Sequence, residues 1–80
     1  MSTRFVAMEK FAVTASATDA TNNYVEVTMP YVATGIVVGV RTSAGALNEA
    51  GLTVTQPTGK IRVAVTDLAA NDVVSIVAFA

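Results

Sequence analysis

The chain has 80 residues, no cysteine or histidine, five basic and six acidic side chains, and a formal net charge of −1. A chain of this length forms one small domain, so we expect residues 1–80 to be a single β domain rather than a two-domain enzyme with a cleft. Without cysteine and histidine, the chain has no thiolate or imidazole metal site and no histidine-dependent nucleophile. Because basic and acidic side chains are nearly equal in number, there is no excess positive charge to attract nucleic acid or anionic lipid.

Apolar residues make up 52% of the chain and charged residues only 14%. This composition is too apolar for a disordered chain and has few charges for a freely soluble monomer. The apolar runs are too short to cross a membrane, and the first residues lack the apolar stretch of an export signal. We therefore expect no membrane partner, and the absence of cysteine fits synthesis in a reducing cytoplasm.

The segment 4–13 is expected to be extended. Its alternate apolar side chains on one face are Phe5, Ala7, Phe11 and Val13. Because a terminal segment is ordered only when something holds it, residues 1–13 have two open interpretations. They form either the first strand of the domain or an arm that adds to a neighbour's sheet or fills a hydrophobic groove. Residues 14–23 are small and polar, and predict a connection or a weak strand.

Period-two alternation predicts the strands that follow. The first covers 24–29, ends at Pro30 and has one apolar face: Val25, Val27 and Met29. The next covers 36–41 and is apolar on both faces. A helical turn is possible over 45–51, although seven residues do not make a stable helix alone.

A hairpin is predicted in the second half of the chain. The strands 52–56 and 60–66 flank Gln56-Pro57-Thr58-Gly59, in which proline and glycine favour a tight turn. In the second of these strands, the inward side chains are Ile61, Val63 and Val65, and the outward ones include Lys60, Arg62 and Thr66. Residues 67–72 form a turn before the final strand.

The final strand, 73–79, is apolar on both faces. A strand of this kind is normally buried on both sides, whereas a two-layer sandwich covers only the inner face of each sheet. A neighbouring chain is therefore expected to cover the outer face. The residues that we predict to contact a partner are the apolar ones near the N terminus and two C-terminal residues taken to face outwards: Phe5, Val6, Met8, Phe11, Val74 and Ile76. The fold class predicted is all-β, a small antiparallel sandwich or jelly-roll-like barrel of about six or seven strands with no substantial helix.

Candidates for chemistry are few. The six acidic residues do not have the spacing of a calcium loop, and the group Asp67, Asn71 and Asp72 is typical of turn hydrogen bonding. Glu26 is expected to face Lys60 or Arg62 across two strands as an exposed ion pair. We therefore predict no catalytic residue, no cofactor and no metal. An alternative function is a small non-catalytic module that binds carbohydrate or peptide, for which Tyr24 and Tyr31 are the available aromatic residues.

Residues 24–80 contain three linked patterns: VxVTMPxxxxGIVVGV, then ALxxAGLTV, then GKIRVAVTDLxxxD, followed by an apolar strand. This stretch, about two-thirds of the chain, resembles small β-rich virion proteins of tailed bacteriophages. The resemblance implies a capsid decoration (cement) protein or a head-fibre-like module, located on the capsid surface, with no catalytic motif. It further implies that the partners are other copies of the chain, with a homotrimer favoured, and the major capsid protein or another virion protein.

Overall fold

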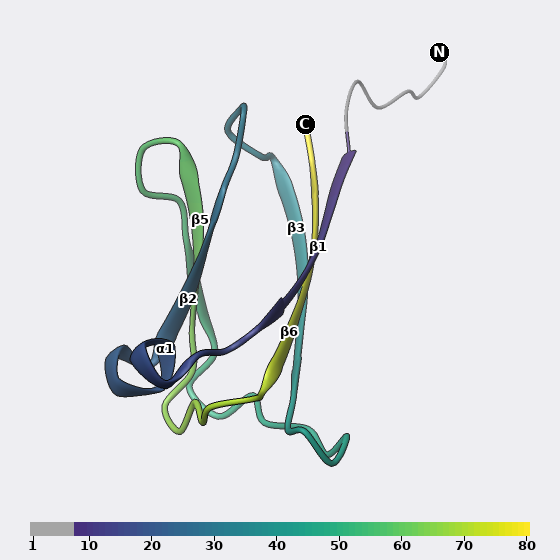
Figure 1. Cartoon of the computed structure of the whole chain (residues 1–80). Coiled ribbons are helices and arrows are strands. Elements are labelled where there is room, and N and C mark those ends of the chain that lie inside the picture. The colour runs from purple at the N-terminus through teal and green to yellow at the C-terminus, as the bar shows by residue number, and fades with distance from the viewer. Residues whose placement is uncertain (1–7) are drawn as a thin grey trace.

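The structure is a computed structural model that describes residues 8–80, which form six strands and one short helix (Figure 1). Sheet A contains β1 (Met8–Thr14), β6 (Val73–Phe79) and β3 (Gly35–Arg41), in that spatial order. Sheet B contains β2 (Tyr24–Thr28), β5 (Lys60–Ala64) and β4 (Thr53–Thr55). All neighbouring strands are antiparallel. The predicted all-β antiparallel sandwich is confirmed.

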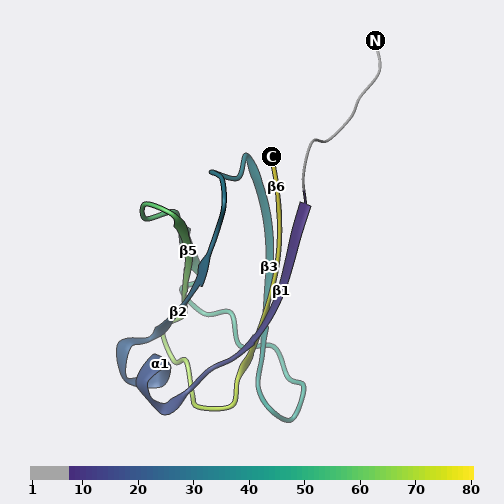
Figure 2. The same ribbon diagram turned by 45° about the horizontal axis from the view of Figure 1, so that its top comes forward.

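The two sheets face each other as separate layers (Figures 1 and 2). Four of the five connections between consecutive strands cross from one sheet to the other, and the exception is the β4–β5 hairpin predicted from Gln56-Pro57-Thr58-Gly59. Gly59 adopts φ 73°, which glycine reaches without a steric penalty. The Gln56 side chain then fixes the loop before β3, because its amide donates to the Ala33 carbonyl and accepts from the Ala33 N–H, both at 2.9 Å.

The core lies between the sheets and consists mainly of β-branched residues on alternate positions. Its largest fully buried side chains are Val25, Val40, Ile61, Val63, Val65, Val74 and Ile76. The inward positions predicted for the strands 24–29 and 60–66 are therefore confirmed. Phe11 and Val13 of β1 are partly buried against the same cluster.

The prediction that Val74 and Ile76 face outwards is wrong, because they are 0% and 1% exposed in the core. The pairing of β6 with its neighbours explains this orientation. Val77 pairs with Lys10, and Val73 pairs with Arg41, so these residues share a face with the two cations. Burying that face would remove two charges from water at a cost of several kcal/mol each, whereas burying the other face of β6 removes only apolar groups.

The segment 14–23 contains a short helix, α1 (Ala17–Asn22), instead of a weak strand. Ser16 and Asp19 form a capping box: the Ser16 hydroxyl accepts from the Asp19 N–H at 3.1 Å, and the Ser16 N–H donates to the Asp19 carboxylate at 3.0 Å. Asn23, in the left-handed region at φ 63°, ends the helix.

The helical turn considered possible over 45–51 is absent. After Gly45, at φ 92°, the chain doubles back on β3, and Leu47 forms an isolated bridge with Arg41. The Asn48 N–H donates to the Val40 carbonyl at 3.0 Å, and the Glu49 carboxylate accepts from the Val40 N–H at 3.0 Å. These contacts satisfy backbone groups at the free edge of β3, which favours an extended segment over a helix here.

Candidate interaction surface

The strand register of sheet A defines its outer face. β1 contributes Met8, Lys10, Ala12 and Thr14; β6 contributes Val73, Ser75, Val77 and Phe79; and β3 contributes Gly35, Val37, Gly39 and Arg41. We call these twelve residues the outer face of sheet A. No other segment among residues 8–80 forms a second layer over it (Figures 1 and 2).

This face exposes several large apolar side chains. Val37 is 62% exposed, Met8 48% and Val73 37%, and they lie on three different strands. The Phe79 ring lies over Gly35, where a Cβ atom would overlap the ring, so this glycine allows the ring to lie close to the backbone. A contiguous exposed apolar sheet face is typical of a surface that contacts another molecule.

Two basic side chains, Lys10 and Arg41, belong to the same face, and both are exposed. All six carboxylate side chains of the chain lie within the described residues, and none forms an ion pair with either cation. Glu9 follows the opposite alternation of β1, facing inwards with Phe11. Glu49 lies at the free edge of β3 and accepts the Val40 N–H. The outer face of sheet A therefore has positive charge that the chain itself leaves without a partner.

A hollow of about 370 Å³ opens on this face beside Arg41. Gly39, Val73 and Ser75 lie beneath it, and Arg41 and the loop 42–45 form its side. The Arg41 guanidinium donates from Nη1 to the Gly45 carbonyl at 3.1 Å, which holds it at the rim. The arrangement presents a fixed cation next to a small uncharged depression.

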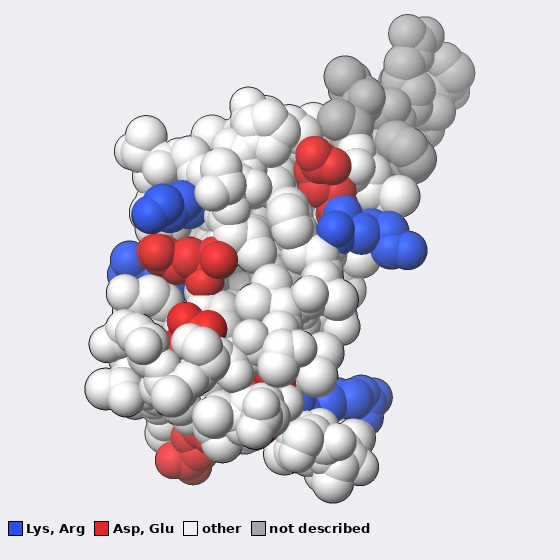
Figure 3. Space-filling view, in the orientation of Figure 1, with Lys and Arg blue, Asp and Glu red and all other residues white. Residues whose placement is uncertain are grey.

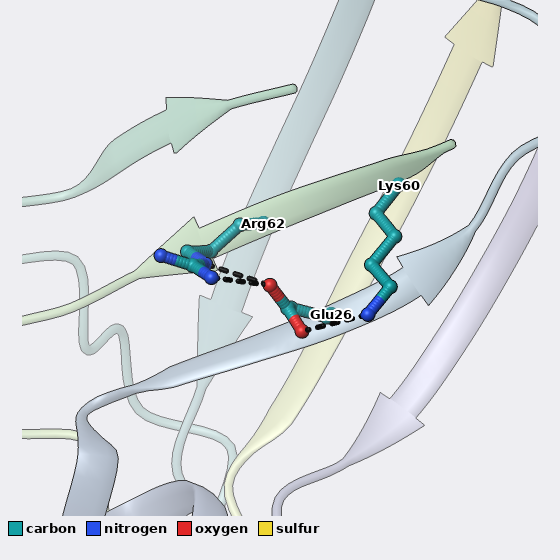
Figure 4. Close-up of polar contacts among 3 residues, drawn as sticks. All are labelled: Glu26, Lys60 and Arg62. Carbon is teal, nitrogen blue, oxygen red and sulfur yellow. Dashed lines mark hydrogen bonds and ion pairs between the residues drawn. The ribbon is translucent and has the colours of Figure 1, made fainter. Parts of the chain in front are cut away.

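The outer face of sheet B differs, because both of its basic side chains pair with a carboxylate (Figure 4). Arg62 donates from Nε to one Glu26 oxygen at 2.8 Å and contacts the same oxygen from Nη2 at 2.7 Å. Lys60 lies 3.6 Å from the other Glu26 oxygen. Arg62 also stacks over the Tyr24 ring, 4.3 Å from its centroid. The predicted pair between Glu26 and the cations of the facing strand is confirmed.

Arg62, by its hydrogen bond and charge, and to a smaller degree Lys60 hold the pKa of Glu26 below its ordinary value of 4.5. A lowered folded-state pKa stabilises the protein above the unfolded-state pKa, and this contribution is lost as the pH falls through the folded-state value. We therefore expect Glu26→Gln to lower the melting temperature at pH 7, with the difference from wild type shrinking below about pH 4.5. Thermal unfolding between pH 7 and pH 2.5 measures it; an unchanged difference throughout would contradict the charge-based origin.

The six residues predicted to contact a partner lie in different parts of the chain and of the fold. Phe5 and Val6 lie outside the described residues. Met8 is exposed on the outer face of sheet A, whereas Phe11 packs against the core and Val74 and Ile76 are buried in it. The prediction missed the apolar side chains that the face does expose: Val37, Val73, Val77 and Phe79. The available signal was the pairing of Val77 with Lys10 and of Val73 with Arg41, which needs the strand register.

Other candidate residues do not come together as a site. Tyr24 stacks under Arg62 on sheet B, while Tyr31 packs against the core and lines a hollow that does not include Tyr24. Asp72 is 2% exposed and accepts one hydrogen bond within its own turn, from the Ala69 N–H, as the turn interpretation predicted. Residues 8–80 contain no group of three acidic, cysteine or histidine side chains placed to hold a metal ion.

Residues 8–80 also contain no helix long and apolar enough to cross a membrane. The most distinctive surface of the described chain is the outer face of sheet A, where exposed apolar side chains share the face with Lys10 on one edge strand and Arg41 at one corner. Comparisons with protein-family models, with curated proteins and with solved structures found no match to this chain.

Proposed function

We propose that this chain is a non-catalytic structural protein that binds a larger protein assembly through the outer face of sheet A. The observation that carries the proposal is the exposure of Val37, Met8 and Val73 on a sheet face that residues 8–80 leave uncovered. Binding to an assembled lattice stabilises that lattice by mass action, so the role requires no reactive group.

The specific form that we propose is a capsid decoration protein on the head of a tailed bacteriophage, acting as a trimer. This form rests on the resemblance of residues 24–80 to small virion proteins, and the sandwich fold and the uncovered apolar face are compatible with it. Low charge suits a protein that works within an assembly, where much of its surface is in contact with neighbours.

The test is co-sedimentation of the purified chain with mature heads of the virus that carries its gene, using Val37→Glu and Thr55→Glu as matched variants. Both positions are exposed on outer sheet faces, Val37 on sheet A and Thr55 on sheet B. We expect Val37→Glu to weaken binding at least tenfold, because a carboxylate desolvated in an apolar contact costs more than about 1.4 kcal/mol. Thr55→Glu is expected to bind like wild type.

Wild-type chain that stays in the supernatant at micromolar concentration would refute the decoration role. Equal binding by both variants would refute the assignment of the contact to sheet A. Light scattering after gel filtration tests the trimer separately, and a monomer at micromolar concentration would contradict it.

A further inference from the structure

We propose that the outer face of sheet A docks a protein surface whose apolar centre is flanked by carboxylates, with Lys10 and Arg41 binding those carboxylates. The inference deepens the proposed function and rests on it for the larger assembly, but its chemistry is independent of which assembly that is. It depends on three observations: the unpaired cations, their positions and the size of the face.

The two sheets use their cations differently. On sheet B, both Lys60 and Arg62 pair with Glu26, so each cation has a carboxylate partner, although the three side chains together keep a net charge of +1. On sheet A, neither Lys10 nor Arg41 pairs with any of the six carboxylate side chains. In Figure 3, acidic and basic atoms lie together on the side of sheet B. On the side of sheet A, two separate basic groups project with uncharged atoms between them, and an acidic group lies next to the upper one without forming an ion pair with it. A complementary partner supplies the negative charge.

The positions of the two cations fit a protein surface better than a nucleic acid. Lys10 lies on one edge strand, and Arg41 lies on the other, two side-chain rows farther along the face. Strand spacing places their Cα atoms about 16 Å apart. Val77 lies beside Lys10 and Val73 beside Arg41, with Ser75 between the two valines on β6, and valines do not contact a phosphate backbone favourably. Two carboxylates at the rim of an apolar patch match this pattern.

A second copy of the same face is a poor occupant. Its own cations would meet Lys10 and Arg41 with no carboxylate on the face to balance them, and Glu49 at the edge of β3 already accepts the Val40 N–H at 3.0 Å. The face is also small: three strands of seven residues outline roughly 300 Å², against the approximately 800 Å² that each partner buries in a stable dimer of standard size. A partner that carries carboxylates and also contacts this chain beyond the face meets both requirements.

The hollow beside Arg41 is a site where one carboxylate of the partner can bind. Its rim holds the guanidinium through the 3.1 Å bond from Nη1 to the Gly45 carbonyl, and its base is formed by Gly39 and Ser75, which have small or no side chains. An acidic side chain that enters there meets the remaining guanidinium N–H donors without displacing a protein carboxylate. Guanidinium–carboxylate pairs have strong directional preference, so we expect Arg41 to contribute more than Lys10.

The first experiment measures binding to mature heads at about 50 and 300 mM NaCl for wild type, Lys10→Gln, Arg41→Gln and the matched control Lys60→Gln. Expected results are roughly tenfold weaker binding for Arg41→Gln, about threefold for Lys10→Gln, weaker wild-type binding at high salt, and wild-type behaviour for Lys60→Gln. Heads that bind all four proteins equally would overturn the inference while leaving the proposed function standing.

A second experiment keeps the inference testable if heads do not bind. A random library of twelve-residue peptides is selected on the immobilised wild-type chain, and enriched peptides are tested against Val37→Glu and Thr55→Glu. We expect enriched peptides to combine acidic and apolar residues and to lose binding to Val37→Glu only. No enrichment, basic peptides, or binding that survives Val37→Glu would overturn the inference. A light-scattering mass that falls in Val37→Glu would instead assign the face to a second copy and also overturn it.

Discussion

Ile76→Ala is expected to lower the free energy of unfolding by about 3 kcal/mol, while the neighbouring Val77→Ala lowers it by less than about 1 kcal/mol. Ile76 is 1% exposed between the sheets, so removing three carbon atoms leaves a cavity among Val25, Val63 and the other core residues. Val77 lies on the outer face of sheet A beside Lys10 and Val37, where truncation opens no enclosed cavity. In a domain of this size, the larger change lowers the melting temperature by about 15 °C.

Urea unfolding of the two variants and wild type at the same protein concentration measures the difference. The pair is a matched control because both changes occur in one strand and both remove aliphatic carbon. Binding to a partner should show the reverse order, since Val77 contributes contact area and Ile76 does not. Equal destabilisation by both changes would contradict the orientation of β6.

The orientation of β6 shows where reasoning from the sequence succeeded and where it failed. The strand 60–64 alternates Lys60 and Arg62 with apolar residues, so its own sequence distinguishes inside from outside. The strand 73–79 has no charge, and both alternations are apolar. Its orientation is decided by Lys10 and Arg41 on the neighbouring strands, and those neighbours are known only from the tertiary pairing.

The predictions for the irregular segments 14–23 and 45–51 were wrong for a different reason. Helix α1 has no apolar stripe and none of its residues is buried, so hydrophobic periodicity could not reveal it. The local signal of this helix is the pair Ser16 and Asp19, whose spacing matches a capping box. The segment after Gly45 is held along β3 by the hydrogen bonds of Asn48 and Glu49 with the Val40 backbone, contacts with no sequence pattern of their own.

The candidate interaction surface was only partly accessible from the sequence. The need for an uncovered apolar face followed from the strands that are apolar on both sides, but the residues that form it come from three segments: 8–14, 35–41 and 73–79. These three segments form one surface only when β6 pairs with both β1 and β3 in sheet A. The unpaired state of Lys10 and Arg41 is likewise a property of the assembled face.

Asp72→Ala is expected to cost about 3 kcal/mol in the free energy of unfolding, comparable with the loss of a core side chain. A single oxygen of the buried Asp72 carboxylate accepts two hydrogen bonds, from the Ala69 N–H at 2.9 Å and from the Asn48 side-chain amide at 2.7 Å. Removing that oxygen leaves two donors without their acceptor, and hydrogen bonds to a charged group contribute about 1.5–3 kcal/mol each. The Asn48 N–H also donates to the Val40 carbonyl, so the change loosens the segment that covers the edge of β3.

Two control variants separate this hydrogen bonding from the charge. Asp72→Asn keeps an oxygen in the accepting position, so it should lose less than about 1.5 kcal/mol. Asp67→Ala should be nearly neutral, because Asp67 is exposed and its contribution to Asn48 comes from the backbone carbonyl, which alanine retains. Denaturant unfolding of the three variants ranks them. If Asp72→Ala matched Asp67→Ala, the carboxylate would have no structural role, and its burial would need another explanation, since a buried carboxylate without bonding partners is strongly unfavourable.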